Sequence, residues 1–129
     1  MEKRQVNPWT WQDARGFSQA WNVEGARAVL FVSGQGPLSA DGELVGEGDF
    51  EAQARRTFDN LEAVLHQAGL SFDSVVKVGV YLTDIAQLPV YGRVKAEHIR
   101  GPQPASTAVE VSRLALPGMM IEVEAIAVS

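Results

Sequence analysis

Two segments near the end of the chain, PASTAVEVSRL (residues 104–114) and IEVEAIA (residues 121–127), decide the fold class. Both are rich in β-branched and apolar residues, which predicts two buried strands that turn at Leu116-Pro117-Gly118. Glu122 and Glu124 lie two positions apart in the second strand, so both project from the same face. Because an unpaired carboxylate is costly to bury, this face either lines a cleft or meets partners on another subunit.

The middle of the chain predicts two helices on either side of a central strand. Asp49 is a suitable N-cap for a helix that ends at Gly69, and the apolar residues between them recur every three or four positions. Residues 75–82 are β-branched and apolar toward both faces, as in a central strand. Residues 84–100 form a weaker helical pattern, with Pro89 in its first turn.

The first third of the chain predicts two more strands. Residues 17–23 and 27–33 read as strands joined by the turn signal Glu24-Gly25, and the glycine-rich segment 34–48 reads as a loop or hairpin. The predicted order is therefore ββαβαββ. We expect one α+β domain spanning residues 1–129, with two helices packed on a mixed sheet.

Composition excludes several function classes. The chain has no cysteine and only two histidines, so thiolate chemistry and zinc sites are not expected. The net charge of −5 opposes binding to a phosphate backbone, so we expect no nucleic-acid partner. No apolar run is long enough for a membrane span, and no signal peptide is visible, so we expect a cytoplasmic protein without a membrane partner.

The predicted sheet has one face that the two helices cannot cover. Residues 75–82 and 119–128 are apolar toward both faces, and a chain of this length has no further helix to place on the second one. A second copy of the chain is the simplest cover, so we expect an obligate homo-oligomer. Loops folding back over this face are the alternative.

Short motifs spread over about 110 positions together resemble one family, the reactive intermediate deaminases (Rid, also called YjgF). The matching segments are residues 16–20, 32–35, 51–55, 58–61, 68–70, 75–78, 81–84, 104–106, 109–111 and 121–127. The resemblance implies a chorismate-mutase-like fold, a homotrimer whose sheets form a barrel, and ligand clefts between subunits.

Family members with deaminase activity are hydrolases of enamines and imines, such as 2-aminoacrylate and 2-iminobutanoate, and they release ammonia without a metal or cofactor. By resemblance, Glu122 is the residue that handles the water and its proton, a role that suits a carboxyl group. Ser33 matches the serine of the family's cleft, and Gly34 lets the backbone approach a ligand closely.

Three positions depart from the family's pattern. Ser106 replaces the arginine that holds the substrate carboxylate, Phe17 replaces a tyrosine, and Gly92 replaces an asparagine. A hydroxyl cannot offer the two parallel charged donors of an arginine, so activity on 2-iminobutanoate or 2-aminoacrylate is expected to be impaired. Among the cations that could replace the arginine we prefer Arg93; Lys95, Arg15 and Arg113 are the others.

The sequence leaves two hypotheses of different classes open. In the first, the clefts bind a small imine, enamine or related metabolite, and Glu122 activates water to hydrolyse it. In the second, the trimer has no catalytic activity and senses a metabolite or regulates a partner protein.

Overall fold

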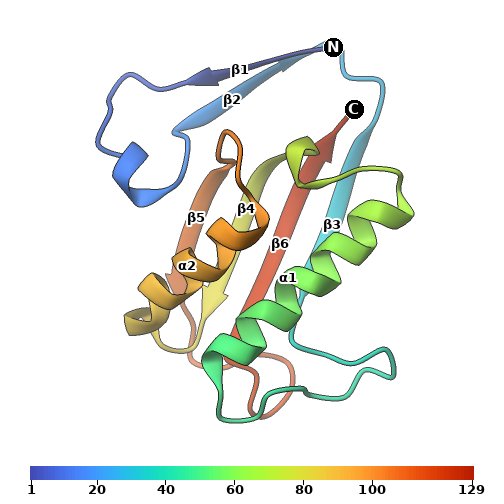
Figure 1. Ribbon diagram of the computed structural model, residues 1–129, viewed down its shortest axis with the longest axis vertical. Coiled ribbons are helices and arrows are strands. Elements are labelled where there is room, and N and C mark those ends of the chain that lie inside the picture. Colours follow the sequence, from blue (N-terminus) through green and yellow to red (C-terminus); the bar gives the residue numbers. More distant parts are fainter.

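The computed structural model describes all residues, 1–129, as an α+β fold with one main sheet (Figure 1). The two helices lie on the same face of a four-stranded mixed sheet with the strand order β3-β6-β4-β5. The strands are β1 (Glu2–Val6), β2 (Ala20–Glu24), β3 (Val29–Gln35), β4 (Val75–Leu82), β5 (Ala105–Glu110) and β6 (Ile121–Val128), and the helices are α1 (Phe50–Gln67) and α2 (Leu88–His98).

Helix α1 forms where its pattern predicted it. The side chain of Asp49 accepts a hydrogen bond of 3.1 Å from the backbone N–H of Ala52, which satisfies one free donor of the first turn. The helix ends before Gly69, whose φ of +75° is a conformation that glycine adopts without strain. The apolar face of α1 is buried against the sheet, through Phe50, Ala54, Phe58, Leu61 and Leu65.

The core lies between the helices and the two central strands. Strands β4 and β6 are antiparallel, and alternate residues of each point toward the helices. These residues are almost fully buried: Val78, Val80 and Leu82 of β4, and Ile121, Val123, Ala125 and Ala127 of β6. Alternate residues on the other side, including Glu122 and Glu124, share the opposite face, as the sequence predicted.

The strand pairing corrects the sequence-based interpretation in two places. Strand β2 does not pair with β3; it pairs with β1, a strand for which the sequence analysis made no prediction, and the two form a separate ribbon beside the main sheet (Figure 1). Strands β5 and β6 are not neighbours either, because β4 lies between them. Both errors assumed that strands adjacent in sequence pair directly, which is a tendency and not a rule.

The face of the sheet opposite the helices, which we call the open face, carries uncovered apolar side chains. Phe31 is 76% exposed, Val29 49% and Val109 40%. Exposed apolar side chains on a sheet face are typical of a surface that meets another protein. Neither helix has the length and apolar character that crossing a bilayer requires.

Candidate functional site

Three residues at which the sequence departs from the resembled family meet in one pocket. Phe17, Gly92 and Ser106 all line a cavity of about 310 Å³ between α2, strand β5 and the segment before β2. Ser106 is placed there because it lies beside Val78 in the β4–β5 ladder, and Val78 faces the helices. The sequence analysis thus identified residues far apart in the chain that share one cavity.

This cavity adjoins a wider one of about 640 Å³ that continues along α2. The two share Arg15, Leu88, Gly92 and Lys95, and we call them together the α2 groove. Lys95 is only 6% exposed, and its ammonium donates a hydrogen bond to the carbonyl of Gly16. Burial lowers the pKa of Lys95, because desolvation disfavours the charged form.

Arg93, the cation that the sequence analysis preferred, lies outside the α2 groove. Its guanidinium is exposed and forms an ion pair of 2.9 Å with Glu51 of α1. Lys95 and Arg15 line the groove instead. The position of Arg93 therefore does not support it as a replacement for the arginine that position 106 lacks. Lys95, two residues further along the helix, lies in the groove.

A second group of candidate residues gathers at the open face. Glu122 is half-buried, and its carboxylate has neither a hydrogen-bond partner nor an ion-pair partner within the chain. The side chain of Glu122 lies directly against the backbone of Gly34, where the pairing of β3 with β6 is irregular. Ser33, beside that glycine, is exposed on the same strand. A free carboxylate next to bare backbone and a hydroxyl is a suitable place to position a water molecule.

Polar side chains of α1 hold the loop that follows Gly34, and the sequence analysis did not foresee them. Gln53 is fully buried and makes three hydrogen bonds of 2.8–3.1 Å, to the backbone of Gly46, Gly118 and Met120. Asn60 donates to the carbonyls of Gly36 and Leu38. A glutamine on the apolar face of a predicted helix was the signal available, because buried polar groups need partners.

We expect Gly34→Ala to displace the Glu122 carboxylate while leaving the fold intact. A methyl group at position 34 would lie 2.6 Å from Cδ of Glu122, and the flexible end of the glutamate is the part that can move away. A shift of about 1 Å in a reacting group can cost roughly 100-fold in rate, so we expect a loss of that order in any reaction that depends on this carboxylate. Thermal unfolding monitored by circular dichroism should change little.

Gly101→Ala is the matched control for this substitution. Its added methyl group would approach only Asp73 Oδ1, at the ordinary distance of 3.8 Å. Equal rates for the native protein and Gly34→Ala would show that the close contact between Gly34 and the Glu122 side chain does not position the carboxylate for a reaction.

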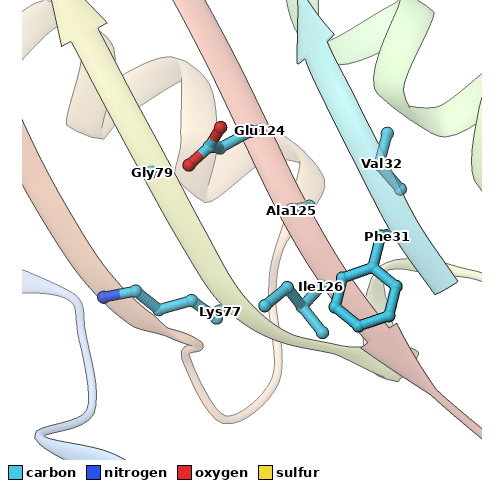
Figure 2. Close-up of a pocket in the computed structure, with 7 residues that line it drawn as sticks. All are labelled: Phe31, Val32, Lys77, Gly79, Glu124, Ala125 and Ile126. Atoms are coloured by element: carbon cyan, nitrogen blue, oxygen red, sulfur yellow. The ribbon is translucent and has the colours of Figure 1, made fainter. Parts of the chain in front are cut away.

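The neighbouring carboxylate, that of Glu124, has a hydrogen-bond partner within the chain. It accepts a hydrogen bond of 3.1 Å from the hydroxyl of Tyr81, and this bond raises the pKa of the tyrosine. Figure 2 shows Glu124 pointing toward Gly79 at the edge of a hollow on the open face, with Lys77, Phe31 and Ile126 further along. The hollow has a volume of about 220 Å³ and mostly apolar walls. Glu124 therefore has a structural partner, which Glu122 does not.

The two groups of candidate residues cannot meet within one copy of the chain. Phe17 and Ser106 face the helix side, whereas Ser33, Gly34 and Glu122 lie at the open face. They also lie toward opposite edges of the sheet, because β5 and β3 are its two edge strands and β6, which carries Glu122, is next to β3. A site that uses both groups must be built from two copies.

The sequence matches one family model and several proteins related to it. Residues 11–129 match the family model described as endoribonuclease L-PSP. A RutC family protein of Pyrococcus abyssi is 43% identical over 112 residues, which cover 86% of this chain and 84% of the relative. Protein DfrA of Myxococcus xanthus is 40% identical over 114 residues, or 88% of this chain and 85% of its own.

Solved structures agree with the sequence relatives. A protein of unknown function from Yersinia pestis, YyfB of the conserved Rid family, superposes with a TM-score of 0.89 at 34% identity over the full length of both chains. RidA from an Antarctic Psychrobacter has a TM-score of 0.73 at 34% identity and covers 88% of each chain.

Proposed function

Because the chain belongs to the Rid (YjgF, endoribonuclease L-PSP) family, we propose that residues 1–129 form one domain of a homotrimer that binds a small metabolite between subunits. We further propose that Glu122 activates a water molecule in this cleft to hydrolyse an imine or enamine, with release of ammonia. The observation that carries this proposal is the free carboxylate of Glu122 against Gly34, beside Ser33.

The placement of the two residue groups supports a site between subunits. In a closed ring, each subunit presents one edge of its sheet to the opposite edge of the next subunit. Such a ring brings the β3 side of one copy, with Ser33 and Glu122, next to the β5 side of its neighbour, with Phe17 and Ser106. The exposed apolar side chains of the open face, including Phe31, would be covered in the same assembly.

The chemistry that we propose needs no group beyond the protein's own side chains and water. The Glu122 carboxylate accepts a proton from water as the oxygen attacks the imine carbon, and the protonated carboxyl donates this proton to the nitrogen, which gives a carbinolamine. The carboxylate then accepts the hydroxyl proton of the carbinolamine and passes it to the nitrogen as the C–N bond breaks. The products are a carbonyl compound and ammonia. In this proposal Ser33 donates a hydrogen bond to the ligand, and Phe17 supplies an apolar wall from the neighbouring subunit.

Endoribonuclease activity, which the name of the family model suggests, has less support in this chain. The net charge is −5, and the two histidines are used elsewhere. His98 stacks on Phe58 at 5.1 Å, and its Nδ1 lies 2.9 Å from the carbonyl oxygen of Val94. His66 lies on the exposed face of α1, 3.7 Å from Glu62. The net negative charge opposes binding to a phosphate backbone, and each histidine has contacts of its own.

Ser106→Arg tests whether the cleft is competent for the family's reaction. We expect the native protein to hydrolyse enzymatically generated 2-iminobutanoate slowly, and the variant to be at least about tenfold faster, because a charged, bidentate contact to the substrate carboxylate is worth on the order of 2–5 kcal/mol. Keto-acid and ammonia release give the rate, and sedimentation velocity gives the oligomeric state.

Ser112→Arg is the control, because it adds the same charge at an exposed loop residue. No turnover by the native protein or by Ser106→Arg would contradict the hydrolase proposal and favour the non-enzymatic trimer. A monomer in solution would contradict the shared cleft.

A further inference from the structure

Lys95 is a buried lysine that the proposed hydrolysis does not use. The chain has three lysines, of which Lys3 and Lys77 are half-buried and Lys95 is only 6% exposed. The ammonium of Lys95 donates a hydrogen bond to the carbonyl of Gly16 and takes part in none of the chain's ion pairs. Lysines are almost never fully buried unless a carboxylate pairs with them, so this one requires a separate explanation.

The surroundings of Lys95 favour its uncharged amine. Burial lowers the pKa of Lys95, because desolvation disfavours the charged form. The other cation that lines both parts of the groove is Arg15, whose guanidinium lies 5.3 Å from the ring centre of Trp11. Asp13 is the one acidic residue that lines the groove, and it lines only the wider part. A desolvated lysine without a counter-ion is the form in which lysines act as nucleophiles.

The narrower cavity gives this amine room to react. Its volume is about 310 Å³, at the small end of the range for ligand sites, and Phe17, Leu88 and Ala108 provide apolar walls. A small carbonyl compound with an apolar body fits such a space. Apolar walls also keep water away from a C=N bond once it has formed, which slows the reverse reaction.

The hydroxyl of Tyr91 is a hydrogen-bond donor without a partner in the same cavity. Tyr91 lies one turn before Lys95 on α2, and its ring centre is 6.0 Å from the lysine Nζ. The hydroxyl is buried and makes no hydrogen bond. Burial raises the pKa of Tyr91, so the hydroxyl stays protonated and can donate. Unsatisfied buried groups are rare, and a carbonyl oxygen in the cavity is an acceptor that would satisfy this one.

We infer that Lys95 is a nucleophile that captures a small uncharged aldehyde as a Schiff base in the narrower cavity. The free amine attacks the carbonyl carbon, the nitrogen loses a proton and the oxygen gains one, which gives a carbinolamine. The hydroxyl group then leaves as water, and a C=N bond joins Nζ to the aldehyde carbon. Tyr91 donates a hydrogen bond to the oxygen during the attack. This activity goes beyond the proposed hydrolysis and does not use Glu122.

Reductive trapping of the native protein with benzaldehyde and cyanoborohydride near neutral pH tests the inference. Cyanoborohydride reduces each Schiff base to a stable benzylamine, and peptide mass mapping identifies the lysine that carries it. We expect Lys95 to be labelled about tenfold or more faster than Lys3 or Lys77, because the cavity holds the aldehyde beside an uncharged amine. Unfolding in urea should abolish this preference. Equal labelling of the three lysines in the folded protein, or no label on Lys95, overturns the inference.

Variants test the residues, with circular dichroism as the check that each has folded. Lys95→Arg keeps the charge but forms no Schiff base, and Lys95→Met keeps the apolar stem without an amine, so both should lose the preferred label. Lys77→Arg is the matched control, at a lysine that donates to Thr107 on the open face, and it should leave the labelling of Lys95 unchanged. Tyr91→Phe should slow the labelling of Lys95 by about 3- to 10-fold, as loss of one hydrogen bond does. An undiminished yield of benzylated protein in both Lys95 variants overturns the inference.

The trapping experiment also separates this inference from the proposed hydrolysis. Glu122→Gln should be labelled at Lys95 as fast as the native protein even though its turnover is lost. Loss of the label in Glu122→Gln would overturn the capture by Lys95 alone. Absence of imine turnover in the native protein contradicts the hydrolase and leaves a selective label on Lys95 as support for the capture.

Discussion

Glu122→Gln is expected to lower kcat/KM for imine hydrolysis by about 10²- to 10⁴-fold, the contribution typical of a positioned general acid–base group. The amide has nearly the same size as the carboxylate but cannot take a proton from water. Glu122 has no partner within the chain, so the substitution breaks no ion pair or hydrogen bond of the fold. Release of ammonia from 2-iminobutanoate, made in situ by an amino-acid-deaminating enzyme, provides the measurement.

Glu124→Gln is the matched control for this experiment. It lies two residues further along the same strand, on the same face, and it is held by Tyr81. We expect its rate to stay within a few-fold of the native value, because an amide oxygen can still accept the tyrosine hydrogen bond. Equal losses in the two variants would indicate a shared structural effect, and full activity in Glu122→Gln would remove this residue from the mechanism.

Phe58→Ala is expected to lower the free energy of unfolding by about 3–5 kcal/mol, as large-to-small substitutions in a core commonly do. Phe58 is fully buried on α1 and contacts three other rings, those of Phe72, Tyr91 and His98, at centroid distances of 5.1–6.2 Å. Such a loss is a large part of the total stability of a domain of this size. Urea unfolding at one fixed protein concentration measures it, since association also contributes to stability.

Glu62→Ala on the same helix is the comparison for Phe58→Ala. Its side chain is 41% exposed and lies 3.7 Å from His66, a surface contact that contributes little. We expect a change within about 0.5 kcal/mol. A similar loss in both variants would contradict the role assigned to the aromatic cluster.

Much of the local structure was predictable because it depends on neighbours in sequence. The three- and four-residue spacing of apolar side chains along α1, with Asp49 before it and Gly69 after it, is sufficient to define that helix. The run of residues 75–82 defines β4 in the same way. The alternation of strand residues also placed Glu122 and Glu124 on one face, and the resemblance to the Rid family drew attention to Ser33, Gly34 and Ser106.

Strand pairing and the surroundings of single polar groups were decided by the tertiary structure. The segment Glu2–Val6 carries no strong strand pattern, and it becomes a strand because β2 offers it a free edge. Arg93 and Lys95 are two positions apart on one helix, so they point in different directions: one reaches Glu51 at the surface and the other is buried against Gly16. Periodicity identifies which residues become buried. The hydrogen-bond or ion-pair partner of each polar residue depends on contacts between segments distant in sequence, and a local pattern does not contain this information.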